Sequence, residues 1–216
     1  MRSLVILAEL VQECANPRDF AHTFVPIPRS FLRGIFIQEL AELSSASSCE
    51  IYNYGFPQSL PNRRDVALVV LDQPIQLSEY GKIPDAGFLD SLAAARGTKN
   101  VLFTASGYGL RGKQEDHNGK PNETYRERLM ALSALVNVRS ALSYGFNLQT
   151  VGNSAGKGGT CNGDSGGPVF WGNFESNLIV AVTSFGLNEL CRGTDFAYRI
   201  DQPDVLAWLA EHMYLP

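Results

Sequence analysis

The segment from Cys161 to Pro168, Cys-Asn-Gly-Asp-Ser-Gly-Gly-Pro, places a single serine among glycines. A serine hydroxyl is a weak nucleophile at neutral pH and needs a neighbouring base, while the negative oxygen of a tetrahedral acyl intermediate needs preorganised donors. Because glycine leaves the backbone accessible, the N–H groups of Gly163 and Ser165 can approach such an oxygen. The segment therefore indicates acyl-transfer chemistry, with Ser165 as the nucleophile and these two N–H groups as the oxyanion hole.

The same residues contain a shorter pattern, Gly-x-Ser-x-Gly, which is typical of the nucleophile elbow of α/β-hydrolases. Asp195, Asp201 and His212 follow Ser165 in the order that this fold requires. The elbow requires a helix directly after the serine, and two glycines in a first helical turn cost about 2 kcal/mol relative to alanine. The next residues, Pro168 to Trp171, instead form an apolar run that predicts a strand. The sequence therefore disfavours the elbow.

The run Gly163 to Pro168 resembles the nucleophile motif Gly-Asp-Ser-Gly-Gly-Pro of the chymotrypsin/trypsin-like serine proteases, in the bacterial or fungal trypsin-like branch. Four flanking segments are similar to elements of that family and follow in the family's order. They are the strand Val101–Gly109 that opens the second barrel, the substrate-pairing strand Ile179–Gly186 with Ser184, the last barrel strand Phe196–Ile200, and the C-terminal helix Asp201–His212. The agreement of several segments is more specific than one motif.

The acid of the expected catalytic triad is Asp65. The run Arg64 to Leu71 places this carboxylate directly before a strongly apolar strand, and it is similar to the family's Asp-Ile-Ala-Leu. A carboxylate buried there can accept the N–H of an imidazole and fix its tautomer and orientation. The resemblance also implies that Asp164 receives the N-terminal ammonium formed on activation, but no segment resembles the family's Ile-Val-Gly-Gly start.

The sequence leaves open which residue acts as the catalytic base. The family's histidine precedes its aspartate in Thr-Ala-Ala-His-Cys, and His22, which lies 43 residues before Asp65, keeps only the Ala-His pair. Another register aligns Leu10–Cys14 with the motif, but it puts Glu13 in the place of the histidine, and a carboxylate with an ordinary pKa of about 4.3 is too weak a base. Three explanations stay open: the histidine lies upstream of Met1, His22 is the base in a divergent setting, or the base has been lost.

Cysteines indicate an oxidising compartment. The resemblance implies a disulfide between Cys161 and Cys191 that braces the specificity pocket, whereas Cys14 and Cys49 either pair or stay as free thiols. The N-terminal residues resemble a signal peptide only faintly, because Glu9 interrupts the apolar stretch. A secreted or extracytoplasmic location is therefore expected from the family and the disulfide.

The resemblance also suggests which residues line the substrate pocket. Gly159 falls where trypsin has the aspartate of the pocket floor, Thr160 follows it, and Gly186 keeps the pocket mouth open. Asp195 either lines the same pocket from a neighbouring strand or is a solvent-facing turn residue. In the first case, we expect cleavage after arginine or lysine.

Composition excludes several other classes of protein. The 216 residues are 44% hydrophobic and 19% charged, so the chain can bury a sizeable core and needs no metal to fold. A net charge of −4 without a basic cluster argues against nucleic acid as a partner. There is no apolar run of the length needed for a membrane span. We expect a monomer that acts on protein or peptide substrates.

Together these features predict an all-β fold of two antiparallel six-stranded barrels, with the active site between them and a C-terminal helix. Residues 1–98 would hold a first barrel, which looks incomplete, and the linker; residues 99–216 would hold the second barrel and the nucleophile loop. The predicted function is that of a serine endopeptidase without a cofactor. The alternative is a catalytically inactive homologue that binds a partner through the retained cleft.

Overall fold

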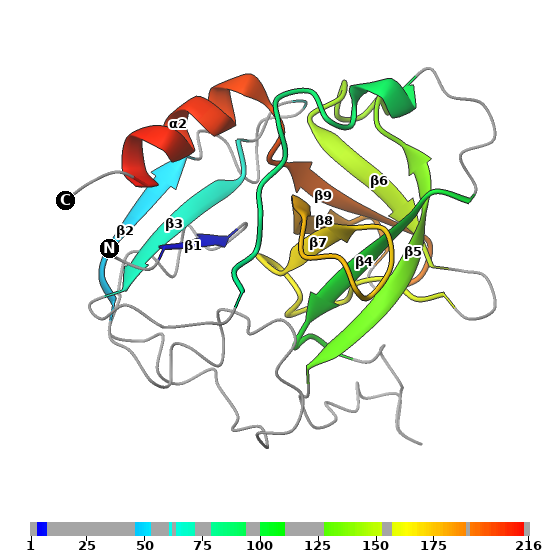
Figure 1. Ribbon diagram of the computed structural model, residues 1–216. Helices are drawn as coiled ribbons and strands as arrows, with labels where there is room; N and C mark the ends of the chain where they lie inside the picture. Colours follow the sequence, from blue (N-terminus) through cyan, green and yellow to red (C-terminus); the bar gives the residue numbers. More distant parts are fainter. Residues whose placement is uncertain are drawn as a thin grey trace.

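A computed structural model of the protein describes residues 4–7, 46–52, 61, 64–71, 79–93, 100–110, 128–152, 157–188 and 191–213. Their main feature is a closed antiparallel barrel with the strand order β4-β5-β6-β9-β8-β7 (Figure 1). Its strands are β4 (Leu102–Gly107), β5 (Leu129–Asn137), β6 (Asn147–Val151), β7 (Pro168–Trp171), β8 (Ile179–Gly186) and β9 (Thr194–Arg199). Pairing of β4 with β7 closes the barrel. The predicted second barrel is confirmed.

Apolar side chains fill the barrel because these strands are rich in β-branched and aromatic residues, which suit a pleated, half-buried surface. Phe103 of β4, Leu148 of β6 and Val180 of β8 are fully buried in one hydrophobic cluster. Phe103 also packs edge-on against Trp171, with 5.5 Å between ring centroids. The barrel is therefore a packed scaffold that holds the loops at its rim.

The N-terminal part contributes a three-stranded antiparallel sheet with the order β1-β3-β2. Its strands are β1 (Leu4–Leu7), β2 (Ala46–Tyr52) and β3 (Val66–Leu71). Within the described part of the chain this sheet is open. Much of residues 1–98 lies outside the described residues, so the incomplete first barrel stays a prediction. The division of the chain at residue 98 stays a prediction.

The C-terminal helix α2 (Pro203–Met213) returns to the N-terminal sheet (Figure 1). Val205 and Leu209 of the helix share a buried cluster with Leu68 of β3 and Tyr198 of β9. The helix begins two residues later than Asp201, because proline is well tolerated in a first helical turn and Asp204 there complements the helix dipole. The helix thus joins the sheet to the barrel.

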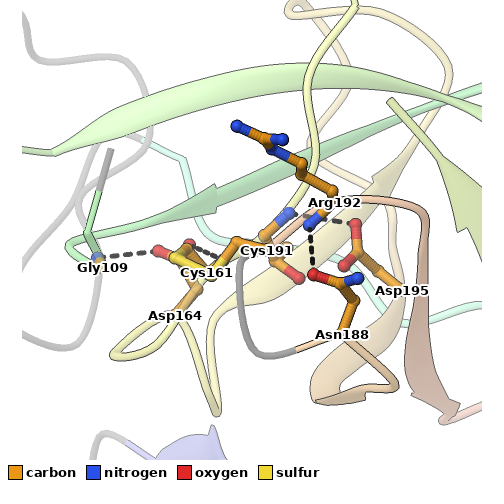
Figure 2. Close-up of a disulfide and its surroundings, with 8 residues drawn as sticks. Gly109, Cys161, Asp164, Asn188, Cys191, Arg192 and Asp195 are labelled. Atoms are coloured by element: carbon orange, nitrogen blue, oxygen red, sulfur yellow. Dashed lines mark hydrogen bonds between the residues drawn. A yellow bond between two sulfur atoms is a disulfide. The ribbon is translucent and has the colours of Figure 1, made fainter. Parts of the chain in front are cut away.

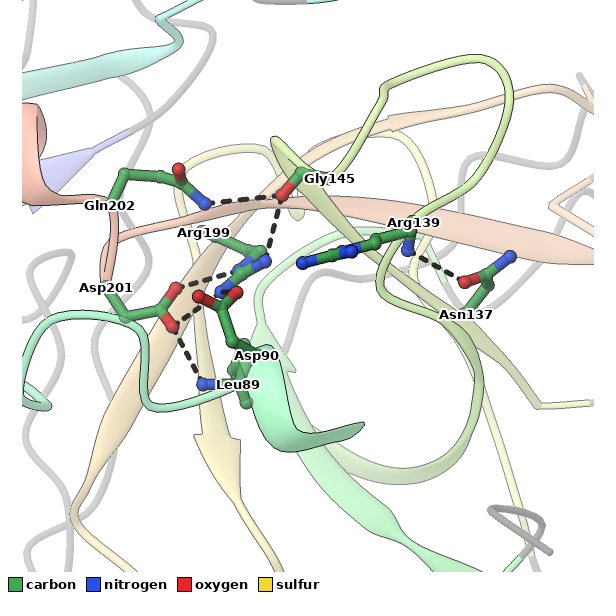
Figure 3. Close-up of polar contacts among 8 residues, drawn as sticks. All are labelled: Leu89, Asp90, Asn137, Arg139, Gly145, Arg199, Asp201 and Gln202. Carbon is green, nitrogen blue, oxygen red and sulfur yellow. Dashed lines mark hydrogen bonds and ion pairs between the residues drawn. The ribbon is translucent and has the colours of Figure 1, made fainter. Parts of the chain in front are cut away.

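Asp201 instead belongs to a buried ion-pair cluster (Figure 3). The Arg199 side chain is 2% exposed, donates to Asp201 through Nε (2.8 Å) and NH2 (2.7 Å), and reaches Asp90 Oδ1 at 2.8 Å. Asp90 begins the short 3-10 helix η2 (Asp90–Ala93) in the segment before β4, and the Leu89 N–H donates to Asp201 Oδ2 at 2.8 Å. The cluster fastens this connecting segment to the end of β9.

The arrangement excludes the α/β-hydrolase elbow. The residues after Ser165 form strand β7, which pairs antiparallel with β8, where the elbow requires a helix. Asp201 is the partner of Arg199 at the start of the C-terminal segment. The side chain of His212 lies outside the described residues.

Candidate active site

The nucleophile loop is tied to the barrel on both sides of Ser165 by backbone hydrogen bonds. The Gly166 N–H donates to the Thr183 carbonyl at 2.9 Å, and the Thr183 N–H donates to the Gly167 carbonyl at 2.8 Å. Gly163 and Gly166 adopt φ values of 97° and 79°, a region that strongly favours glycine. The loop conformation therefore explains why the serine is set among glycines.

Asp164 is held by backbone donors from two directions (Figure 2). The Gly109 N–H donates to Oδ1 and the Cys161 N–H to Oδ2, each at 2.8 Å. A Cβ placed on Gly107 or Gly109 would collide with the Asp164 carboxylate. The Gly-Tyr-Gly at the end of β4 is thus required by the close approach of this carboxylate, which fixes the loop that carries Ser165.

The predicted disulfide between Cys161 and Cys191 is present, with a sequence separation of 30 and a Cα–Cα distance of 5.0 Å (Figure 2). It links the start of the nucleophile loop to the segment that leads into β9. The predicted pairing of Cys161 with Cys191 is therefore confirmed. Cys14 lies outside the described residues, as does the side chain of Cys49 in β2.

Asp65 lies directly before β3 and is 1% exposed. The Ser184 hydroxyl of β8, which is also 1% exposed, donates to Asp65 Oδ2 at 2.5 Å. These residues are 119 positions apart, so the bond joins the N-terminal sheet to the barrel.

A cavity of about 490 Å³ opens beside the nucleophile loop. Among its lining residues are Ser165, Thr160, Thr183, Ser184, Gly186 and Asp195. The structure therefore brings the expected nucleophile and four of the five expected pocket residues to one cavity. The fifth, Gly159, contacts this group through Asp195, because a Cβ at Gly159 would collide with Asp195 Oδ2.

Asp195 is a strand residue, since β9 begins two residues earlier than the sequence predicts. It is opposite Thr150 of β6 and Gly186 of β8. Burial raises the pKa of its carboxyl above 3.8, an effect that is partly opposed by hydrogen bonds from Thr160. The Thr160 N–H donates to Oδ2 at 3.0 Å. This places a carboxylate at the cavity rather than in a solvent-facing turn.

The candidates for the base belong to the N-terminal part of the chain. His22, Glu13 and the alternative register Leu10–Cys14 lie outside the described residues, so the choice among the three explanations for the base stays open. Groups of metal-ligating side chains are absent from the described part of the chain. No helix in these ranges is long and apolar enough to cross a membrane.

Sequence reasoning missed two features of the site. It did not predict the bond from Ser184 to Asp65, although both residues had been singled out separately. It also passed over Thr183, which lines the cavity and is 5% exposed. Its place next to Ser184 is no signal for this role, because successive side chains of a strand point to opposite faces.

Comparisons with known proteins agree with this fold. Human heparin binding protein is similar to the chain with a TM-score of 0.56 and 21% identity, over 80% of this chain and 67% of that one. An atomic-resolution structure of HBP has a TM-score of 0.56 and 21% identity, over 80% of this chain and 68% of that one. A mutant of human heparin binding protein has a TM-score of 0.54 and 22% identity, over 80% of this chain and 67% of that one. No curated protein sequence matches the chain. Its sequence matches the trypsin family over residues 41–209, and the protein therefore belongs to the trypsin family.

Proposed function

We propose that the protein is a serine endopeptidase that hydrolyses peptide bonds through an acyl-enzyme on Ser165. The observation that carries the proposal is the buried Asp65 carboxylate, which accepts a hydrogen bond from Ser184. Ser184 lines the same cavity as Ser165. A buried acid, a serine in a braced glycine loop and an adjoining cavity are the parts that acyl transfer by this family requires.

In the proposed reaction, Ser165 Oγ attacks the carbonyl carbon of the scissile peptide while a histidine removes its proton. Asp65 orients that histidine, for which His22 is the candidate in this chain. The N–H groups of Gly163 and Ser165 stabilise the oxyanion. The histidine then protonates the leaving amine, and water releases the acyl group by the same steps in reverse order.

Asp195 gives the proposed enzyme a preference for substrates with arginine or lysine before the scissile bond. Its carboxylate lies at the cavity, and its burial means that ionisation is costly until a cation enters. An Asp195→Ser variant is expected to lose this preference. The measurement is the ratio of kcat/KM for arginine and phenylalanine peptides; an unchanged ratio would reject the assignment.

Kinetics of peptide hydrolysis test the catalytic assignment. Ser165→Ala removes the nucleophile and is expected to abolish acyl-enzyme turnover. Asp65→Asn keeps the shape of the side chain, but it favours the wrong histidine tautomer and is expected to lower kcat by about 10⁴-fold. Equal activity of the parent chain and both variants would show that another group performs the reaction.

A second candidate is a catalytically inactive homologue that binds a partner through the cavity. The name of human heparin binding protein describes binding, and that protein shares the fold. The net charge of −4 disfavours heparin, a polyanion, as the ligand of this chain. An exported protein is proposed in either case, because the Cys161–Cys191 disulfide persists in oxidising compartments. A monomeric state stays a prediction.

A further inference from the structure

The Thr183 side chain carries a buried polar group that no described residue satisfies. Thr183 is 5% exposed, and its Oγ1 has no hydrogen-bond partner among the described residues. A buried hydroxyl without a partner is costly, and native structures keep few of them. Because Thr183 also lines the cavity beside Ser165, a group that enters this cavity is positioned to supply the missing partner.

Two other hydroxyls that line the cavity, those of Thr160 and Ser184, are already engaged. The Thr160 side chain forms a hydrogen bond with Asp195, and the Ser184 hydroxyl donates to Asp65. Thr183 differs from these two neighbours because its backbone is bonded to the nucleophile loop while its hydroxyl remains unsatisfied. The hydroxyl is therefore held in a fixed position without a structural bond of its own.

The strand register places this hydroxyl on the same side of the barrel wall as the Asp195 carboxylate. Thr183 is paired with Ala197 of β9, and Asp195 lies two residues before Ala197 in the same strand. Residues two apart in a strand point to the same face, and diagonal neighbours across a strand pair are about 7 to 8 Å apart. A group with several N–H donors can contact two acceptors at that spacing.

We propose that Thr183 is a specificity-determining residue, whose hydroxyl accepts a hydrogen bond from the cationic group that Asp195 binds. The group is the ammonium or guanidinium of the residue before the scissile bond. Both cations carry at least three donors, so one reaches the carboxylate and another the hydroxyl. An apolar side chain would leave Thr183 Oγ1 unsatisfied. This inference rests on the proposed function and adds to it a second acceptor on a different strand.

Two variants separate the hydroxyl from the shape of the side chain. Thr183→Val replaces the hydroxyl by a methyl group, whereas Thr183→Ser keeps the hydroxyl and removes the methyl. We expect Thr183→Val to lower kcat/KM for lysine and arginine peptides by about tenfold or more, the value of a hydrogen bond to a charged group. We expect the ratio of kcat/KM for basic over phenylalanine peptides to fall with Thr183→Val, and Thr183→Ser to retain the preference for basic residues.

Binding of small cations tests the same inference without catalysis. Calorimetry with benzamidine and with n-butylamine is expected to give dissociation constants about tenfold weaker for Thr183→Val than for the parent chain or Thr183→Ser. Thermal unfolding of Thr183→Val is expected at or above the parent temperature, because an unsatisfied buried group has been removed. A lower unfolding temperature together with lost binding in both variants would overturn the assignment, since the effect would then come from packing.

The outcomes distinguish this inference from the proposed function. If the parent chain binds the cations with the expected dependence on Thr183 but hydrolyses no peptide, the inference stands and the proposed function fails. If the parent chain cleaves after basic residues and Thr183→Val changes neither kcat/KM nor cation affinity, the inference fails and the proposed function stands. A parent chain that binds neither cation overturns the inference as well.

Discussion

At the scale of single residues, the carboxylates of Asp65 and Asp195 differ in the donors that face them. Asp65 is almost completely buried and accepts the Ser184 hydroxyl. Asp195 accepts the Thr160 N–H, but burial dominates and raises its pKa. Asp65 is thus suited to orient a neighbouring group, and Asp195 to respond to a cation that enters the cavity.

The raised pKa of Asp195 predicts opposite effects of pH on folding and on cation binding. The folded protein binds this proton more tightly than the unfolded chain, so the stabilising contribution is present below the ordinary value of 3.8 and is lost as pH rises through the folded-state pKa. Cation binding needs the carboxylate, so benzamidine affinity should fall on acidification with a midpoint above 3.8.

Calorimetric titrations with benzamidine across the acidic range measure this midpoint, and Asp195→Asn supplies the control. The variant should bind benzamidine weakly at every pH and show no such midpoint. A midpoint that persists in Asp195→Asn would assign the titration to another group.

At the scale of elements, the segments with the strongest residue patterns were the most predictable. The β-branched run of β8 has the bounds that the sequence predicts, Ile179–Gly186. The sequence predicts that β9 begins at Phe196, but the strand begins two residues earlier, at Thr194. Thr194 and Asp195 pair with β6, and Asp195 also pairs with β8. The start of this strand is therefore set by hydrogen bonds to strands distant in sequence and not by the local residue pattern.

The sequence predicts only the part of the site that belongs to recognisable motifs. Ser165, Asp65 and the Cys161–Cys191 pair belong to motifs that can be read along the chain. The unsatisfied Thr183 hydroxyl and the place of Asp195 beside Thr160 depend on register between strands, which includes an irregularity between Thr183 and Phe185. The sequence therefore leaves two places open for Asp195, and it does not mark the Thr183 hydroxyl.

The disulfide is the covalent brace of the nucleophile loop, and its removal tests how much the loop depends on it. A double variant, Cys161→Ala with Cys191→Ala, is expected to lower the free energy of unfolding by about 3 to 4 kcal/mol, because a closure of 30 residues no longer restricts the unfolded chain. Denaturant unfolding measures this change. A loss below about 1 kcal/mol would mean that the hydrogen bonds of the loop hold it without the disulfide.

At the scale of the whole molecule, contacts between residues far apart in sequence hold the sheet, the connecting segment and the barrel together. Asp65 meets Ser184 across the sheet and the barrel, and Arg199 gathers Asp90 and Asp201 at the connecting segment (Figure 3). Breaking a buried ion pair leaves an uncompensated charge, so such contacts are costly to remove.

The Arg199 cluster therefore predicts a large effect on stability. Arg199→Met is expected to lower the free energy of unfolding by about 3 to 5 kcal/mol, because two carboxylates lose their cation and Asp201 is fully buried. The matched control is Arg64→Met, which removes a surface pair with Asp204 at 3.7 Å and should cost less than about 1 kcal/mol. Equal losses for the two variants would contradict the structural role given to the cluster.

Labelling by a fluorophosphonate probe measures the activation of Ser165, because the probe reacts with a serine only where a base and an oxyanion hole are assembled. Mass spectrometry of the labelled chain is predicted to find the adduct on Ser165, with labelling abolished in Ser165→Ala and strongly slowed in Asp65→Asn. Absence of an adduct on Ser165 in the parent chain, or equal labelling of Ser165→Ala, would show that Ser165 is not the activated nucleophile.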